Sequence, residues 1–360
     1  MQRVRWITVA AGVATLGLVL GGCASKPTPA GGSSSSTAAS ASSFKACMVT
    51  DTGGIDDRSF NAAAWQGMQK AQSDGKATVS YVQSKAETDY APNIAALESQ
   101  SCKFIVTVGG LMGPATTDAA NKSAGQHFAI IDSNGNQKNV TGLQYNTAQA
   151  GFLAGYLAAG YSKTGKVATY GGEKIGPVTI YMDGFWEGVQ YYNTAKGKNV
   201  QVLGWSETTQ NGSFTGSFTD QTQGQQLANN FIAQGADVIF PVAGGTGLGS
   251  AAVAQSTSKA VIIWVDTDGV VSAPQYSSVF LSTAFKNIAP SVTKVIEDAS
   301  GGTFAATDYL GTLANGGVGL APFHDFASKV DPTLQSELTT IKQKIISGEI
   351  KITSPAQPKV

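Results

Sequence analysis

The chain has little charge. Of its 360 residues, 13% are Asp, Glu, Lys or Arg, about half of the usual share of roughly 25%. The 24 basic and 24 acidic residues cancel, and no basic stretch with interleaved aromatic residues occurs. Because a surface that binds nucleic acid needs an excess of positive charge, the composition argues against a nucleic-acid partner.

Histidine and cysteine are scarce as well. The chain has two histidines, His127 and His324, and three cysteines, Cys23, Cys47 and Cys102. No pair among them has the spacing of a zinc site, and there is no Cys-x-x-Cys. Gly-x-Ser-x-Gly and His-Glu-x-x-His are also missing. We therefore expect no metal, no cofactor and no catalytic residues.

Long apolar runs are nearly absent too, and the one present lies at the N-terminus. After two arginines, the run from Trp6 to Leu20 is about 15 residues long, short of the ~20 that span a membrane. Two glycines and Cys23 follow. This order is typical of a secretory signal peptide, over residues 1–22. The Cys after small residues resembles the lipobox of bacterial lipoproteins, in which that Cys carries the lipids.

A tether of small and polar residues is expected after the signal peptide. Residues 23–43 are rich in Ser, Gly, Pro and Ala and offer no side chains for a core. The folded part should therefore begin near Phe44, held outside the cytoplasm by a lipid anchor at Cys23. In such a compartment a disulfide can persist. Cys47 and Cys102 could form one, since their strands could be neighbours, but the sequence leaves the bridge open.

Beyond the tether, short β-rich runs alternate with helix-length segments. Expected strands are 45–50, 77–83, 103–108, 127–132, 140–145, 166–170, 199–205, 237–242, 260–265 and 278–283. Expected helices are 59–73, 88–100, 113–124, 146–161, 177–196, 219–234, 246–258, 285–300 and 332–347. Such alternation predicts parallel sheets with helices on both faces, and two strand series suit two sheets.

Polar and glycine-rich segments follow the expected strands, where open α/β sheets bind ligands. Asp51 and Asp57 follow the first strand and could accept hydrogen bonds from a hydroxylated ligand, or cap the helix beginning near Ser59. Phe60-Asn61 could stack on a planar ring and read its edge, or be a core residue and a cap. Lys286 could bind ligand hydroxyls or be solvated. The glycines around Gly245 fit a ligand loop or a tight turn equally well.

These segments together resemble the basic membrane protein (BMP) family of bacterial lipoproteins, which includes purine nucleoside receptor A-like proteins. The matching stretches are Val49-Thr-Asp-Thr-Gly-Gly-Ile-Asp-Asp-Arg-Ser-Phe-Asn61, Phe128-Ala-Ile-Ile-Asp132, Gly151-Phe-Leu-Ala-Gly155, Gly216-Ser-Phe-Thr-Asp220, Ala243-Gly-Gly-Thr-Gly247, Val265-Asp-Thr-Asp268 and Ser282-Thr-Ala-Phe-Lys286. The first stretch is the most specific. The resemblance covers nearly everything after the tether.

The resemblance implies an α/β protein with the type I periplasmic-binding-protein fold, in which two doubly wound parallel-sheet lobes are joined by three crossovers. The first lobe would comprise 44–145 plus 284–312, and the second 146–283 plus 313–360. Ligand would lie in the cleft between them. Members are the substrate-binding components of ABC importers, so a membrane permease is the implied partner, and such receptors mostly act as monomers.

The same resemblance assigns the site residues. A base would lie between Phe60 and a second-lobe aromatic, for which we choose Phe218 over Phe214 and Tyr181. The base edge would be read by Asn61 and by Asp51 or Asp57, and Ser59 is also expected to bind the ligand. The ribose would contact Asp132, Gly245, Asp266 and Lys286.

The leading hypothesis is thus a lipid-anchored receptor that captures a nucleoside, with a purine preferred, for import. A sugar or other small polar solute is the first alternative, because an aromatic-lined cleft with carboxylates suits it as well. A nucleoside hydrolase would use Asp51, Asp56 and Asp57 to hold calcium. A surface interaction protein would have a vestigial cleft.

Overall fold

Two six-stranded sheets organise residues 43–359, the part of the chain that the computed structural model describes. The expected signal peptide, Cys23 and the tether up to residue 42 lie outside the described residues. All ten expected strands and all nine expected helices form, most within two residues of the expected bounds. Within the described range, no helix has both the length and the apolar character that a membrane crossing requires.

The first sheet contains, in spatial order, β13 (Tyr309–Gly311), β5 (Val140–Tyr145), β4 (His127–Ile131), β3 (Phe104–Val108), β1 (Lys45–Val49) and β2 (Thr78–Val82). All of its strand pairs are parallel. Strands such as β3 read as continuous apolar runs because helices cover both faces of a parallel sheet.

The second sheet has the same architecture. Its order is β14 (Val318–Leu320), β12 (Phe280–Lys286), β11 (Val261–Asp266), β10 (Val238–Val242), β6 (Lys166–Gly171) and β7 (Gln201–Leu203). All pairs are parallel except β12 with β14. A separate hairpin, β8 (Trp205–Ser206) and β9 (Asn211–Gly212), forms in the Gly/Ser/Thr-rich stretch after β7.

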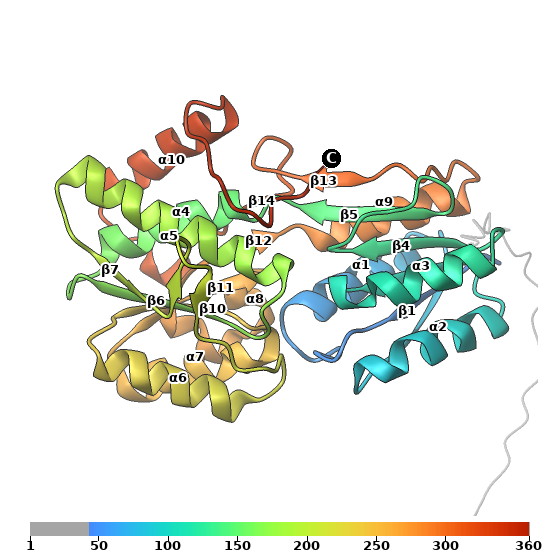
Figure 1. Cartoon of the computed structure of the whole chain (residues 1–360), viewed down its shortest axis with the longest axis horizontal. Helices are drawn as coiled ribbons and strands as arrows, with labels where there is room; N and C mark the ends of the chain where they lie inside the picture. Colours follow the sequence, from blue (N-terminus) through green and yellow to red (C-terminus); the bar gives the residue numbers. More distant parts are fainter. Residues whose placement is uncertain (1–42, 360) are drawn as a thin grey trace, which may run out of the picture. The chain divides into compact units, whose positions relative to one another are not determined.

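Helices pack in pairs on both faces of each sheet (Figure 1). In the first lobe, α1 packs on α9 and α2 on α3; in the second, α4 packs on α5 and α6 on α7. The α-helices are α1 (Phe60–Ser73), α2 (Tyr90–Ser99), α3 (Gly113–Lys122), α4 (Ala148–Tyr161), α5 (Gly176–Lys196), α6 (Gln221–Ala233), α7 (Gly247–Thr257), α8 (Gly269–Ser272), α9 (Ile288–Ser300) and α10 (Pro332–Ile346). The 3₁₀ turns are η1 (Glu87–Asp89), η2 (Gly110–Met112), η3 (Gly244–Thr246), η4 (Pro274–Val279) and η5 (His324–Phe326).

The chain passes between the two sheets three times, after β5, after β12 and between β13 and β14. Two parallel sheets joined in this way are the expected architecture. Strand β12 continues to Lys286 in the second sheet, so the expected boundary at residue 284 falls inside that strand. Lys286 is thus the last residue of β12, whereas we expected it in the following helix.

A disulfide joins Cys47 of β1 to Cys102, just before β3. The two strands are neighbours, with Ala46 opposite Phe104. The structure therefore decides a question that the sequence left open. The bridge closes a sequence separation of 55 residues within the first lobe, and both cysteines are buried.

Helices α4 and α5 approach so closely that glycines are required where they meet. A Cβ on Gly155 would lie 2.0 Å from the carbonyl oxygen of Phe185, and one on Gly188 would lie 2.0 Å from that of Phe152. Helix α4 is buried on nearly all sides because the second sheet and α10 flank it as well. Gly151-Phe-Leu-Ala-Gly155 therefore carries a packing function.

Replacing Gly155 by Ala should destabilise the protein by about 1–3 kcal/mol, because the added methyl group collides with backbone that has little freedom to move. Urea unfolding followed by circular dichroism measures this change. Gly125→Ala is the matched control, since a Cβ there meets nothing within 4 Å. Equal stabilities of the two variants would show that the α4–α5 contact tolerates a wider separation.

Candidate functional site

The candidate site lies where strand order reverses in both sheets. In the first sheet, β1 has β2 on one side and β3 on the other; in the second, β6 has β7 on one side and β10 on the other. The loops that leave neighbouring strands at such a point diverge and open a crevice. The largest share of the cavity wall comes from the segments after β1, β3, β6 and β10.

The space between the atoms that line the cavity is about 560 Å³, and this figure includes open solvent at its mouth. Eight of the ten ligand-binding residues expected from the sequence line it: Asp51, Asp57, Phe60, Asn61, Asp132, Phe218, Asp266 and Lys286. They come from segments up to 235 positions apart in sequence (286 − 51). The fold therefore brings most of the expected set together.

One polar cluster comes entirely from the loop after β1 and the first turn of α1. Asn61 donates one side-chain N–H to Asp51 Oδ1 at 2.8 Å and the other to Asp57 Oδ2 at 3.0 Å. Asp57 also accepts from the backbone N–H groups of Ser59, Asn61 and Ala62. Asp57 thus caps α1, and the two donors of Asn61 are committed to carboxylates.

Asp51 keeps one oxygen for the cavity. Its Oδ1 accepts from Asn61 and from the backbone N–H of Gly53 at 2.8 Å, while Oδ2 lies beside Gly109. A Cβ on Gly109 would lie 3.0 Å from this oxygen, and the φ of 114° also requires glycine. Asp51 Oδ2 is therefore the atom of this cluster that is free to bind a ligand.

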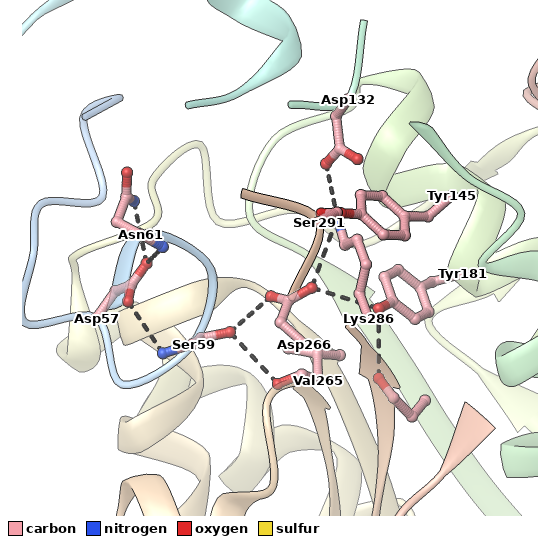
Figure 2. Close-up of polar contacts among 11 residues, drawn as sticks. Asp57, Ser59, Asn61, Asp132, Tyr145, Tyr181, Val265, Asp266, Lys286 and Ser291 are labelled. Carbon is pink, nitrogen blue, oxygen red and sulfur yellow. Dashed lines mark hydrogen bonds and ion pairs between the residues drawn. The ribbon is translucent and has the colours of Figure 1, made fainter. Parts of the chain in front are cut away.

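The second polar cluster gathers around a buried ammonium group (Figure 2). Lys286 Nζ lies 2.6 Å from Asp132 Oδ2 and 3.6 Å from Asp266 Oδ1. Tyr181 donates its hydroxyl to Asp266 Oδ1 at 3.3 Å. The ammonium also lies 4.5 Å from the centroid of the Phe60 ring. A ligand hydroxyl entering here would find charged donors and acceptors, which form the stronger hydrogen bonds.

Burial makes the carboxyl groups of Asp51, Asp57 and Asp132 reluctant to ionise. It raises the pKa of Asp51 to about 7, against the lowering effect of the hydrogen bonds from Asn61 and Gly53. Burial likewise raises the pKa of Asp57 to about 6, although Asn61 and Ser59 donate to it. The pKa of Asp132 is raised by burial, with Lys286 opposing the shift. Asp51 therefore changes charge near neutral pH.

Aromatic rings from both lobes face the cavity. Phe60 at the start of α1 and Phe218 before α6 both line it, as does Tyr181 of α5. Phe214 does not: its ring packs edge-on against Trp205 with centroids 5.8 Å apart, and it covers Gly171. Of the three second-lobe aromatic residues considered from the sequence, Phe218 and Tyr181 therefore line the cavity. The Tyr181 hydroxyl group is already hydrogen-bonded to Asp266.

Two expected ligand residues lie behind the wall. Ser59 is fully buried and its hydroxyl donates to Asp266 Oδ2 at 2.6 Å. Gly245 lies beneath Phe218, with a Cβ position 3.2 Å from the Phe218 carbonyl oxygen, while its neighbour Gly244 lines the cavity. Neither lines the cavity, because each packs against a residue that does.

Sequence reasoning missed the apolar part of the wall. Leu111, Ile175, Pro177 and Val178 line the cavity, from the segments after β3 and β6. These residues carry no chemical signal that separates them from core residues. Their position soon after a strand was the one feature that could have identified them. We applied that criterion to polar, aromatic and glycine residues and left apolar residues out.

The structure gives no support to a calcium site at the three aspartates. Asp56 is exposed, away from the buried Asp51 and Asp57, and the amide N–H groups of Asn61 occupy the space between the other two carboxylates. Across residues 43–359, no group of three His, Cys, Asp or Glu side chains is arranged to hold a metal ion.

Comparison with known proteins identifies the family of this chain. The family described as "ABC transporter substrate-binding protein PnrA-like" (Bmp) matches residues 44–355. A CD4+ T-cell-stimulating antigen of Listeria innocua is 32% identical over 361 residues, covering 95% of this chain and 96% of that protein. The ABC transporter nucleoside-binding protein BmpA of Lactococcus lactis is 29% identical over 332 residues, covering 86% and 89%.

A solved structure shows the same architecture. An ABC transporter solute-binding protein from Aeropyrum pernix K1 superposes with a TM-score of 0.77 at 25% identity, covering 87% of this chain and 94% of that one. The two lobes therefore have the type I periplasmic-binding-protein fold expected from the sequence, and the family's members are binding proteins and not hydrolases. The chain belongs to the PnrA-like (BMP) family of ABC-transporter substrate-binding proteins.

Proposed function

We propose that this solute-binding protein captures a nucleoside, with a purine nucleoside preferred, and delivers it to the permease of an ABC importer. The observation that carries the proposal is the composition of the cavity wall. It presents one phenyl ring from each lobe, Phe60 and Phe218, and two separate polar clusters. A nucleoside likewise combines a flat ring with two polar parts, the base edge and the ribose.

Each polar cluster suits one part of a nucleoside. Asp51 Oδ2 could accept from an N–H group on the base edge, since the donors of Asn61 are already used. At the other cluster, Asp132 and Asp266 could accept from ribose hydroxyls, and Lys286 could donate to them. Phe60 and Phe218 would contact the two faces of the base. The relative in Lactococcus lactis named as nucleoside-binding supports this assignment.

The charge of the cavity favours an uncharged ligand. Four carboxyl groups line it, from Asp51, Asp57, Asp132 and Asp266, against the single ammonium of Lys286. Although burial raises the pKa of Asp51 to about 7 and that of Asp57 to about 6, a phosphate group would meet ionised carboxylates above neutral pH, in a buried site where screening is weak. We therefore expect nucleosides to bind and nucleoside monophosphates to be rejected.

We further propose that the mature protein is anchored outside the cytoplasm by lipids on Cys23. The support is the order of a charged start, an apolar run, two glycines and Cys23 in residues 1–23, followed by the Ser/Gly/Pro/Ala tether. Such a tether leaves the two lobes free to move beside the membrane. Cleft closure on the ligand would then present the closed form to the permease.

The decisive experiment is thermal unfolding of the refolded protein with nucleosides, nucleoside 5′-monophosphates, free bases and sugars. A nucleoside at 100 times its dissociation constant should stabilise the protein by about 2.7 kcal/mol. Ribose, glucose and monophosphates should produce no shift at the same concentration. Phe60→Ala should abolish the shift because the base loses one stacking face.

The control is Phe214→Ala, which removes an aromatic ring of the second lobe that does not line the cavity. It should lower the melting temperature of the free protein yet preserve the nucleoside-induced shift. A shift with sugars alone would replace the nucleoside by a sugar as the ligand. No shift with any compound would contradict a solute receptor for these classes.

Binding of inosine should weaken as the pH falls. Burial raises the pKa of Asp51 to about 7, and the ionised carboxylate is a much stronger acceptor for the N1–H group of the base than the neutral carboxyl group is. Lowering the pH from 8 to 6 should therefore reduce the affinity about tenfold. Isothermal titration calorimetry across this range measures the change.

Asp51→Asn supplies the comparison, because it should bind weakly at every pH and lose most of the pH dependence. An affinity that rises as the pH falls would mean that the neutral carboxyl of Asp51 donates to the base, and the assignment of acceptor and donor would be reversed.

A further inference from the structure

Ser59 occupies the N-cap position of α1 but does not cap it. Serine at this position usually accepts a hydrogen bond from the second or third backbone N–H of its own helix. Here the Ser59 side chain makes no such bond. Asp57 performs the capping, accepting from the backbone N–H groups of Asn61 and Ala62. The Ser59 hydroxyl is therefore available for another partner.

That partner lies in the other lobe. Ser59 Oγ donates to Asp266 Oδ2 at 2.6 Å, and the Val265 carbonyl oxygen lies 3.4 Å away (Figure 2). Ser59 precedes a helix of the first lobe, whereas Asp266 ends strand β11 of the second. Both side chains are more than nine-tenths buried, so the bond to the carboxyl group is shielded from water.

A second bond crosses between the lobes beside the first. Trp264 Nε1 donates to the Arg58 carbonyl oxygen at 3.3 Å. Arg58 has a φ of 56°, a left-handed conformation that non-glycine residues rarely adopt. Such conformations persist where surrounding contacts hold them. Trp264 also lies in β11, so residues 58 and 59 both bind the end of one strand of the second sheet.

The loop that carries these residues is fixed to the first lobe. Its Ile55 N–H donates to the Gln83 side chain at 2.9 Å, and Asp51 and Asp57 are both bound to Asn61 of α1. When the lobes separate, the loop should therefore move with the first lobe, and the two bonds to β11 must break.

From this geometry we propose that Ser59 is a closure latch and a positioning residue. It holds the lobes together in the closed form through Asp266 and, by fixing Oδ2, directs Oδ1 of the same carboxyl group towards the cavity. Ser59 does not line the cavity. The latch therefore acts on the lifetime of the closed state and not on the choice of ligand. Its effect on ligand release rests on the proposed function, whereas its effect on closure does not.

The test compares Ser59→Ala with Ser282→Ala. Ser282 is also buried and its hydroxyl donates to the Ala321 carbonyl oxygen at 2.8 Å, but both of these residues belong to the second lobe. Each variant thus loses one buried hydroxyl group. In Ser59→Ala the lost hydrogen bond joins the two lobes, and in Ser282→Ala it lies within the second lobe. The full-length chain with Cys23→Ser is labelled at Lys122→Cys and Lys198→Cys, two exposed positions on different lobes.

Single-molecule FRET without ligand measures how long each visit to the closed state lasts. A hydrogen bond to a charged group corresponds to a factor of about 10 to 100. Ser59→Ala should therefore shorten the mean lifetime of the closed state by about that factor, and Ser282→Ala should leave this lifetime unchanged. Equal closed lifetimes in Ser59→Ala and the parent protein would overturn the latch, whether or not nucleosides bind.

Stopped-flow dissociation of guanosine, inosine and adenosine tests the same residue with ligand present. Ser59→Ala should accelerate release of each ligand that binds by one common factor, with little change in the association rate. A factor that differs strongly between ligands would overturn the proposal, because Ser59 would then contact the ligand. Failure of the parent protein to bind any nucleoside would reject the proposed function, while the ligand-free lifetimes would still decide the latch.

Discussion

The cleft depends on the buried ammonium group of Lys286. A buried charge is tolerated only when opposite charges and hydrogen-bond partners surround it, and Lys286 finds these in Asp132 and Asp266. Asp132 follows β4 of the first sheet, while Asp266 and Lys286 end strands of the second. The requirement to pair one cation therefore brings both lobes to the same point. The other two carboxyl groups of the cavity, Asp51 and Asp57, are held separately by Asn61 and by backbone N–H groups.

Around this pair the backbone is held in unusual conformations. Asp132 and Asp266 have φ angles of 63° and 64°, and Arg58 has 56°. Asp132 follows β4 and Asp266 ends β11, whereas Arg58 lies in the loop just before α1. Non-glycine residues in the left-handed region carry a conformational cost. The strand ends are thus shaped to aim side chains into the cleft. The helices behind them, close-packed through glycines such as Gly155, supply a rigid support.

Much of the fold and most of the site could be predicted from the sequence. The alternation of strands and helices is local information, and the carboxyl ends of parallel strands must meet at one edge. That Asp132 and Asp266 share one cleft, although 134 positions separate them (266 − 132) and their strands belong to different sheets, was implied by the resemblance to the BMP family. The continuation of β12 to Lys286 escaped prediction because the pairing with β14, which extends it, involves a segment more than thirty positions further on (318 − 286 = 32).

The sequence by itself determined where strands end and helices begin, because both are set by local pattern, and its resemblance to the BMP family indicated most of the polar and aromatic side chains that line the cleft. It did not determine what each polar atom does there. Only the tertiary structure commits the amide of Asn61 to two carboxylates, turns the hydroxyl of Ser59 from its own helix to Asp266, and joins Cys47 to Cys102. The reason is physical: a hydrogen bond or a disulfide depends on the positions of two atoms in space. Ser59 and Asp266, like Cys47 and Cys102, belong to segments that only folding brings together, and the loop that carries Asp51, Asp57 and Asn61 takes its shape in the folded chain.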